Sequence, residues 1–283
     1  MPRVLIAGCG YVGEATADLF AARGWQVEGW TRSTEAMQQL STKSYPMCAV
    51  DLADQSAVMV CETDFDAVIH CASTRGGDVD LYREVYLEGV RNLRTRFTAA
   101  KLLFVSSTSV YAQTGGELVS EESAAEPTQP TGKILREAER LALEHNGIVV
   151  RLAGLYGPRR SFLLKSLLAG TAAIDPQNDR LLNQIHRDDA ARALVVLLEN
   201  QSTRAELFNV VDDQPIRQSE CYRWLAAKLN RPAPPIGSAP AKRKRGWSNK
   251  RVSNRKLRSM GWVPQYPTFS EGMEKSVLAS FGL

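Results

Sequence analysis

The chain has 283 residues and a formal net charge of +4, with 44% hydrophobic and 23% charged residues. This length supports one large core, or a main domain with a smaller one attached, and the composition is that of a soluble globular protein. No apolar run approaches the length of a membrane-spanning helix and no signal peptide precedes the first expected strand. We therefore expect a cytoplasmic protein without a membrane partner.

The cysteines give no sign of disulfides or of a metal site. There are five of them, an odd number scattered along the chain without Cys-x-x-Cys spacing, which argues against both disulfides and zinc. No cluster of His, Cys and Asp has metal-ligand spacing either. We expect small buried thiols in a reducing compartment and no bound metal.

The segment from Val4 to Gly13 opens as an apolar run of strand length, breaks into Gly-x-Gly-x-x-Gly and continues as an amphipathic helix. An ordinary strand-to-helix turn is one interpretation, but the context favours a dinucleotide-binding loop. The first glycine would permit a tight turn, the second would let the backbone approach a pyrophosphate, and the third would let the helix pack closely on the strand. The helix start would add unpaired N–H groups. The expected phosphate-binding residues are Gly8, Gly10, Tyr11, Val12 and Gly13.

A second strand is predicted from Trp25 to Trp30, and its end carries Thr31, Arg32 and Ser33. The adenine ribose of the cofactor should lie at this strand end. A cation beside small hydroxyl residues suits the phosphorylated ribose of NADP, whereas sites for NAD usually place an acidic residue there. Glu28 is a competing ribose ligand, but it lies inside the strand, and a solvated Arg32 is a further alternative. We expect NADP as the cofactor, with NAD less favoured.

Two more strands are predicted over residues 47–50 and 67–71, and their ends should also face the cofactor. The carboxylate after the first strand would lie by the adenine amino group. The small side chains after the second would leave room for the ribose and phosphates. The residues expected at these two strand ends are Asp51, Leu52, Cys71, Ala72 and Ser73.

Further along, a helical pattern covers about residues 78–97, and a very apolar strand over 102–106 ends in the hydroxyl-rich stretch Ser106 to Tyr111. Four hydroxyls at one strand end indicate either a turn rich in hydroxyl residues or the edge of an active site. A surface loop over the site is expected across 115–132. A helix over 133–145 and a strand over 148–152 follow.

Strands that alternate with helices predict an α/β fold, a doubly wound parallel sheet of the Rossmann type. We expect residues 1–158 to form this dinucleotide-binding core, with residues 183–200 returning to it. The remainder, 159–182 and 201–283, should form a smaller C-terminal lobe that covers the substrate. A strand over 206–211 and a helix over 219–230 are predicted within that lobe.

Six motifs follow one another along nearly the whole chain: Gly8–Gly13, Phe104–Tyr111, Arg151–Pro158, Ile185–Asp189, Phe208–Val211 and Arg251–Asn254. Their order and spacing resemble the extended short-chain dehydrogenase/reductases, the NAD-dependent epimerase/dehydratase group. The resemblance implies a homodimer formed through helices near residues 80–97 and 133–145. It also places Ser107 at the hydroxyl position that hydrogen-bonds the substrate carbonyl, and Tyr111 four residues later matches the family.

The same resemblance exposes departures from the family. The opening loop has one residue between its first two glycines instead of three, as in an atypical branch. The catalytic Tyr aligns with Thr131, and the Lys that lowers its pKa aligns with Leu135. The positions that grip a nucleotide-sugar diphosphate align with Gly154 and Leu182, which argues against such a substrate. The candidate catalytic residues are therefore substitutes: Ser107, Tyr111, Thr131 and Lys133, with Tyr86 as a further proton donor.

Basic residues gather near the C-terminus, in Lys242–Arg245, Lys250-Arg251 and Arg255-Lys256. A solvated loop is the first interpretation, an anionic group of the substrate the second, and nucleic acid an unfavoured third because interleaved aromatics are missing apart from Trp247. We expect an NADP(H)-binding, epimerase/dehydratase-like oxidoreductase acting on a small hydroxy or carbonyl compound, sugars included. The alternative is a non-catalytic NADP(H)-binding sensor or regulatory protein.

Overall fold

A seven-stranded sheet forms the centre of the computed structural model, which describes residues 1–74, 76–200, 202–237 and 248–283. Every strand pairing in this sheet is parallel. In spatial order the strands are β11 (Glu206–Val210), β7 (Ile148–Leu152), β5 (Lys101–Ser107), β4 (Ala67–His70), β1 (Arg3–Ala7), β2 (Gln26–Thr31) and β3 (Met47–Ala49). The predicted fold class, an α/β doubly wound parallel sheet, is confirmed.

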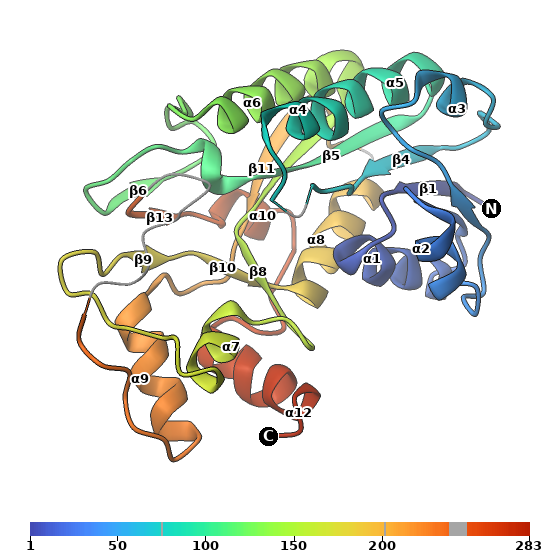
Figure 1. The fold of residues 1–283 in the computed structure, drawn as a ribbon. Helices are drawn as coiled ribbons and strands as arrows, with labels where there is room; N and C mark the ends of the chain where they lie inside the picture. Colours follow the sequence, from blue (N-terminus) through green and yellow to red (C-terminus); the bar gives the residue numbers. More distant parts are fainter. Residues whose placement is uncertain (75, 201, 238–247) are drawn as a thin grey trace.

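Helices cover both faces of the sheet (Figure 1). One face carries α3 (Gln55–Met59), α4 (Val79–Tyr82), α5 (Gly89–Arg96) and α6 (Pro130–Leu143). The other carries α1 (Tyr11–Ala22), α2 (Thr34–Gln39) and α8 (Arg187–Glu199). The strand order reverses between β1 and β4, and in sheets of this kind ligands bind at the carboxyl ends of the strands at that point.

The helix predicted over 78–97 is present, but its middle is the π-helical segment η1 (Arg83–Glu88). His70 causes this local widening, because its Nε2 donates a 2.9 Å hydrogen bond to the Val85 carbonyl. In an α-helix that carbonyl would accept from Gly89, whose N–H bonds to Glu84 instead. A Cβ on Gly89 would lie 2.9 Å from His70 Nε2, so the ring and the helix are in direct contact.

Strand β11 differs from the sequence prediction, which placed residues 206–211 in the smaller lobe. It pairs in parallel with β7 and becomes the edge of the central sheet. Phe208 and Val210 are fully buried, so the strand completes the main core after α8 crosses back over the sheet. Six strands already suggested a complete sheet, and the pattern alone gave no reason to add a seventh.

The smaller lobe lies beside the carboxyl ends of the strands and has a hydrophobic core of its own (Figure 1). Its helices are α7 (Phe162–Leu168), α9 (Gln218–Lys228), α11 (Phe269–Gly272), the π-helical η4 (Met273–Val277) and α12 (Leu278–Ser280). Three small strand pairs connect it to the core: β8 (Gly154–Tyr156) with β10 (Gln184–His186), β9 (Leu181–Leu182) with β12 (Ile216–Arg217), and β6 (Glu117–Val119) with β13 (Lys250–Val252). The remaining short elements are η2 (Thr108–Val110), η3 (Glu144–Asn146) and α10 (Arg255–Ser259).

The Asp189 carboxylate joins the two parts. It accepts hydrogen bonds from the backbone N–H groups of Gln265 at 2.6 Å and Tyr266 at 2.8 Å, and so fixes the C-terminal segment against α8. Among the described residues, no helix has both the length and the apolar character that crossing a membrane requires.

Candidate functional site

The loop between β1 and α1 leaves room for a ligand only above its middle glycine. Gly8 has φ +102°, and a Cβ there would lie 2.2 Å from the Ala72 nitrogen. A Cβ on Gly13 would lie 2.3 Å from the Gly8 carbonyl oxygen, so the helix packs directly on the loop. A Cβ on Gly10 would meet no atom within 4 Å, and no side chain caps the first N–H groups of α1, which begin at Tyr11. The open space therefore lies above Gly10, where the sequence pattern predicts a pyrophosphate.

Tyr11 turns its side chain away from the loop toward the turn after β8. Its hydroxyl donates a 3.0 Å hydrogen bond to the Pro158 carbonyl, and burial raises its pKa to about 12. The guanidinium carbons of Arg160 and Arg187 lie 5.0 and 5.2 Å from the ring centroid. Two cations therefore lie near the start of α1, and the sequence motifs did not predict them.

At the end of β2, Arg32 is exposed, and it forms no ion pair with any described residue. Thr31 is buried and donates to the Ser33 carbonyl at 3.2 Å, while the Ser33 hydroxyl caps α2 by accepting from Ala36 N. The competing ribose ligand, Glu28, is engaged elsewhere, because it accepts a 2.7 Å hydrogen bond from the indole of Trp30. Arg32 thus offers an exposed positive charge at this strand end.

The ends of β3 and β4 are held mainly by backbone hydrogen bonds. Asp51 accepts from Ala53 N at 3.0 Å and is half-buried, and the carbonyl of buried Leu52 accepts from Asn92 at 2.8 Å. Cys71 N and Ala72 N both donate to the Ala7 carbonyl, at 2.8 and 3.1 Å, which draws this strand end over β1. Burial raises the pKa of the Cys71 thiol, and Ser73 is exposed.

A cavity of about 210 Å³ lies where the segment after β5 meets the start of α6. Twelve described residues line it, of which seven carry hydroxyl groups and none is acidic: they are Tyr82, Ser109, Tyr111, Ala112, Thr114, Pro127, Thr128, Gln129, Thr131, Gly132, Leu135 and Ser248. Only the C-terminal end of the loop that we expected over the site, within residues 127–132, contributes to this wall. The cavity is the candidate substrate site.

Of the four candidate catalytic residues, two line the cavity and two do not. Thr131 lines the cavity, and so does Leu135. Ser107 ends β5, does not line the cavity, and its hydroxyl accepts a 3.2 Å hydrogen bond from Ser109 N. Lys133 lies on the exposed side of α6 and does not reach the cavity wall.

Tyr111, the fourth candidate, lines the cavity but its hydroxyl is tied elsewhere. The side chain is fully buried, and its hydroxyl lies 2.9 Å from both the Ser120 carbonyl and Asn209 Oδ1. The guanidinium of Arg151 stacks 4.7 Å from the ring centroid. These contacts make Tyr111 a fixed part of the wall.

Lys250, which the sequence motifs did not select as a site residue, lies behind this wall. Lys250 is 4% exposed, and its ammonium donates 2.9 Å hydrogen bonds to the Tyr111 carbonyl and to the Ser248 hydroxyl. Burial and the nearby charge of Arg180 lower the pKa of Lys250 to about 8. The only signal in the sequence was the Lys250-Arg251 pair, which we grouped with the basic residues. The run Lys242–Arg245 lies outside the described residues, as does Trp247.

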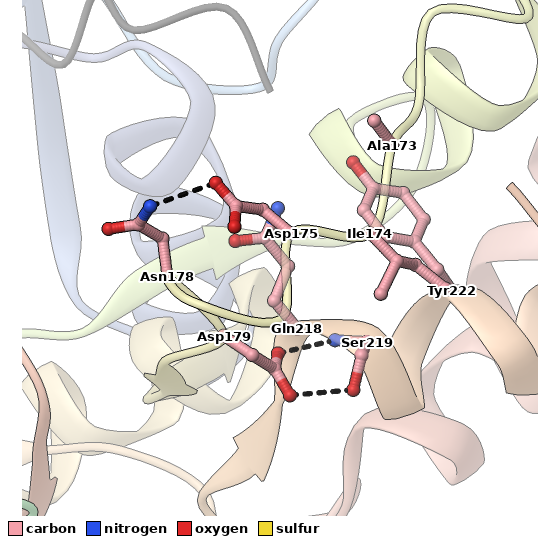
Figure 2. Close-up of a pocket in the computed structure, with 8 residues that line it drawn as sticks. All are labelled: Ala173, Ile174, Asp175, Asn178, Asp179, Gln218, Ser219 and Tyr222. Atoms are coloured by element: carbon pink, nitrogen blue, oxygen red, sulfur yellow. Dashed lines mark hydrogen bonds between the residues drawn. The ribbon is translucent and has the colours of Figure 1, made fainter. Parts of the chain in front are cut away.

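A second hollow lies in the lobe, near the start of α9 (Figure 2). Its volume of about 10 Å³ has room for a water molecule and not for a substrate. Asp179 caps the helix by accepting from the N–H and hydroxyl of Ser219, at 2.9 and 2.7 Å, and Asp175 accepts from Asn178 at 2.8 Å. Across the described ranges, no group of three or more His, Cys, Asp and Glu is arranged to hold a metal ion.

With this geometry in place, comparison with known proteins identifies the family. The model of the NAD dependent epimerase/dehydratase family matches residues 4–210. The chain belongs to this family. The matched range contains the glycine loop, the end of β5 and the start of α6, whereas Ser248 and Lys250 lie beyond it.

Relatives of this epimerase/dehydratase-family chain include the Escherichia coli K12 protein YeeZ, 34% identical over 215 residues that cover 70% of this chain and 74% of YeeZ. A solved structure from Methylobacillus flagellatus, provisionally named an NAD-dependent epimerase/dehydratase, is 27% identical with a TM-score of 0.83, covering 100% and 99% of the two chains. The UDP-glucose 4-epimerase of Thermus thermophilus, solved with NAD, has a TM-score of 0.84 and 21% identity over 100% and 99% of the chains. That last likeness shows the fold alone.

Proposed function

We propose that this chain binds a nicotinamide dinucleotide at the carboxyl ends of β1 and β4, with NADP preferred to NAD, and that it oxidises or reduces a small hydroxy or carbonyl compound. The glycine loop carries the proposal, because Gly8 and Gly13 admit no side chain while the space above Gly10 is open. Family membership supports a nicotinamide dinucleotide, and the Thermus epimerase of the same fold was solved with NAD; neither bears on the preference for NADP.

The preference for NADP rests on Arg32. Its exposed guanidinium stands at the end of β2, where the adenine ribose of a dinucleotide lies in this fold, and Glu28 is already bonded to Trp30. A phosphate on that ribose would gain a charge-assisted hydrogen bond from Arg32, with the hydroxyls of Thr31 and Ser33 nearby.

The substrate would occupy the 210 Å³ cavity. A bound nicotinamide supplies a carbon that accepts or donates hydride. The protein would orient the reacting carbonyl or hydroxyl. Thr131, which lines the cavity and which the sequence alignment assigns to the position of the family's Tyr, is our candidate for this role. Ser107 and Ser109, at the end of β5, hold the adjoining loop.

Label transfer tests this proposal. The purified chain is incubated with NADPH deuterated on one face of the nicotinamide and with small aldehydes, ketones and keto-sugars. We expect stereospecific transfer of deuterium to at least one compound, and a fall of at least tenfold in its rate for Thr131→Val. Tight NADPH binding without any transfer would contradict the enzyme assignment. A wild-type chain that binds neither NADPH nor NADH would contradict the whole proposal.

A second candidate is an NADP(H)-binding sensor without catalysis. The observation in its favour is that Thr131 and Leu135, which the sequence alignment assigns to the positions of the family's Tyr and Lys, line the cavity, while Lys133 is exposed. Saturable NADPH binding, no label transfer and a stable protein partner in pull-downs would support it. Stereospecific label transfer would exclude it.

A further inference from the structure

The candidate substrate cavity has a buried positive charge in its wall, close to Ser248. We propose that the cavity takes a small, hydroxylated compound that carries a carboxylate or phosphate group, and that Ser248, backed by the ammonium of Lys250, binds that anionic group. The inference rests on the proposed function of the cavity as a substrate site, and it names the class of substrate.

Lys250 lacks a counter-ion. The side chain is 96% buried, and among the residues that the structure describes no carboxylate forms an ion pair with it. Arg180, whose charge acts on Lys250, is also positive. Placing an ammonium out of water without an opposite charge costs several kcal/mol, and such groups persist where a ligand or a reaction needs them. An anionic group in the cavity would supply the missing charge.

The hydrogen bonds of Lys250 connect this charge to the cavity. Both acceptors, the Tyr111 carbonyl and the Ser248 hydroxyl, belong to lining residues, and both lie 2.9 Å from Nζ. A serine oxygen that accepts from an ammonium keeps its own hydrogen for another acceptor. No described residue accepts that hydrogen, so an oxygen of a ligand in the cavity can do so, and the ammonium behind Ser248 strengthens the bond.

The rest of the wall fits the same class of ligand. The described residues of the wall include no Asp or Glu to repel an anion, and their hydroxyl groups suit a polyhydroxylated compound. Its volume of about 210 Å³ lies below the roughly 300–1,000 Å³ typical of sites for drug-sized ligands, so it favours a single sugar unit over a nucleotide sugar. Ser248 and Lys250 lie outside the residues matched by the family model, so family membership does not supply this feature.

Calorimetric binding to the full chain tests the inference with glucuronate, glucose 6-phosphate, glucose and UDP-glucuronate. We expect glucuronate or glucose 6-phosphate to bind at least tenfold more tightly than glucose. Lys250→Met should reduce that affinity to the level of glucose, whereas Lys250→Arg should retain part of it. Lys275→Met, which removes an exposed lysine of the lobe, is the matched control and should bind as wild type does.

If a thermal melt shows that Lys250→Met is not folded, Ser248→Ala provides the test instead. It should weaken binding of the preferred anion at least tenfold and leave glucose unchanged. Equal affinities of wild type for glucose and both anions, anion binding unaffected by these variants, or tighter binding of UDP-glucuronate than of glucuronate would overturn the inference. NADPH binding is measured in the same samples. If wild type binds NADPH but gives one of these contradicting results, only the proposed substrate class is overturned. If wild type does not bind NADPH, the proposed function is overturned.

Discussion

Arg151 donates hydrogen bonds of 2.9 and 2.7 Å to the carboxylate of Glu139, and both side chains are at most 2% exposed. Ser106 donates to the same carboxylate at 2.6 Å, and the Arg151 guanidinium stacks on Tyr111. The pair therefore connects α6 and β7 to the loop after β5, which forms part of the cavity wall. The buried ion pair of Glu139 and Arg151 therefore helps to fix one side of the cavity wall.

Breaking this pair should destabilise the chain strongly. Arg151→Met leaves the Glu139 carboxylate buried with one cation fewer, which costs about 3–5 kcal/mol of unfolding free energy. Urea unfolding of wild type and variant measures the difference. Arg136→Met, which removes the more exposed partner of Glu139, should cost clearly less, and Glu139→Leu combined with Arg151→Met should recover part of the loss. A cost below about 1 kcal/mol for Arg151→Met would refute this account.

A substitution at Gly10 can test NADPH binding by the glycine loop without disturbing the fold. A Cβ on Gly10 meets no protein atom, so Gly10→Ala should change the melting temperature little. The same methyl group occupies the space assigned to the pyrophosphate, so NADPH affinity should fall at least tenfold, as titrated by fluorescence. Gly13→Ala serves as the contrast and should destabilise the fold. Unchanged NADPH affinity in folded Gly10→Ala would place the pyrophosphate elsewhere.

Tyr111→Phe tests whether Tyr111 acts as a proton donor. Its buried hydroxyl is bonded to the loop carbonyl of Ser120 and to Asn209, so we expect a stability loss of about 1–2 kcal/mol and less than a fivefold change in kcat. Chemical unfolding and steady-state kinetics provide the two numbers. If kcat fell a hundredfold while stability held, the tyrosine would be catalytic.

His70 should make stability depend on pH. Burial lowers its pKa to about 4 from an ordinary 6.5, so as the pH falls the unfolded chain takes up the proton first. Stability contributed by neutral His70 is complete above pH 6.5 and is lost between pH 6.5 and about 4, a change of up to about 3 kcal/mol. His186, whose pKa is also lowered to about 4, acts in the same direction, while burial raises the pKa of Asp212, which acts in the opposite one.

Comparison with His70→Gln isolates the contribution of His70. The difference in unfolding free energy between wild type and variant should shrink steadily as the pH is lowered from 7 to 4.5. A difference that stays constant over this range would show that His70 is not held neutral.

The sequence predicted the sheet because each central strand is a short apolar run that ends in a turn, as Val4–Ala7 and Ile148–Leu152 do. It did not predict the widened turn at Val85, because the cause is a hydrogen bond from His70, fifteen residues earlier in the chain. Strand β11 was recognised as a strand but assigned to the wrong part of the molecule. Its position depends on where α8 returns, which local pattern does not encode.

The candidate site, like the fold, was predicted from the sequence only in part. The spacing of the glycines predicted a close approach at Gly13, where a Cβ would meet Gly8, but it did not show that a Cβ on Gly8 would meet Ala72, which follows another strand. Lys250 lies beside the cavity because β13 pairs with β6, more than a hundred residues away, and a basic pair in the sequence cannot show burial. Lys133 illustrates the reverse, since its proximity to Thr131 in the sequence does not bring its side chain to the cavity.

The central claim, binding of NADP(H) by the glycine loop with Arg32 on the phosphate, is tested most directly by dissociation constants of NADPH and NADH for wild type and Arg32→Ala. We expect wild type to prefer NADPH, and Arg32→Ala to lose about 1.5–3 kcal/mol of NADPH binding free energy with little change for NADH. Arg23→Ala, which removes an exposed arginine at the end of α1, should match wild type. Equal losses for both cofactors in Arg32→Ala, or a wild type that prefers NADH, would contradict the account.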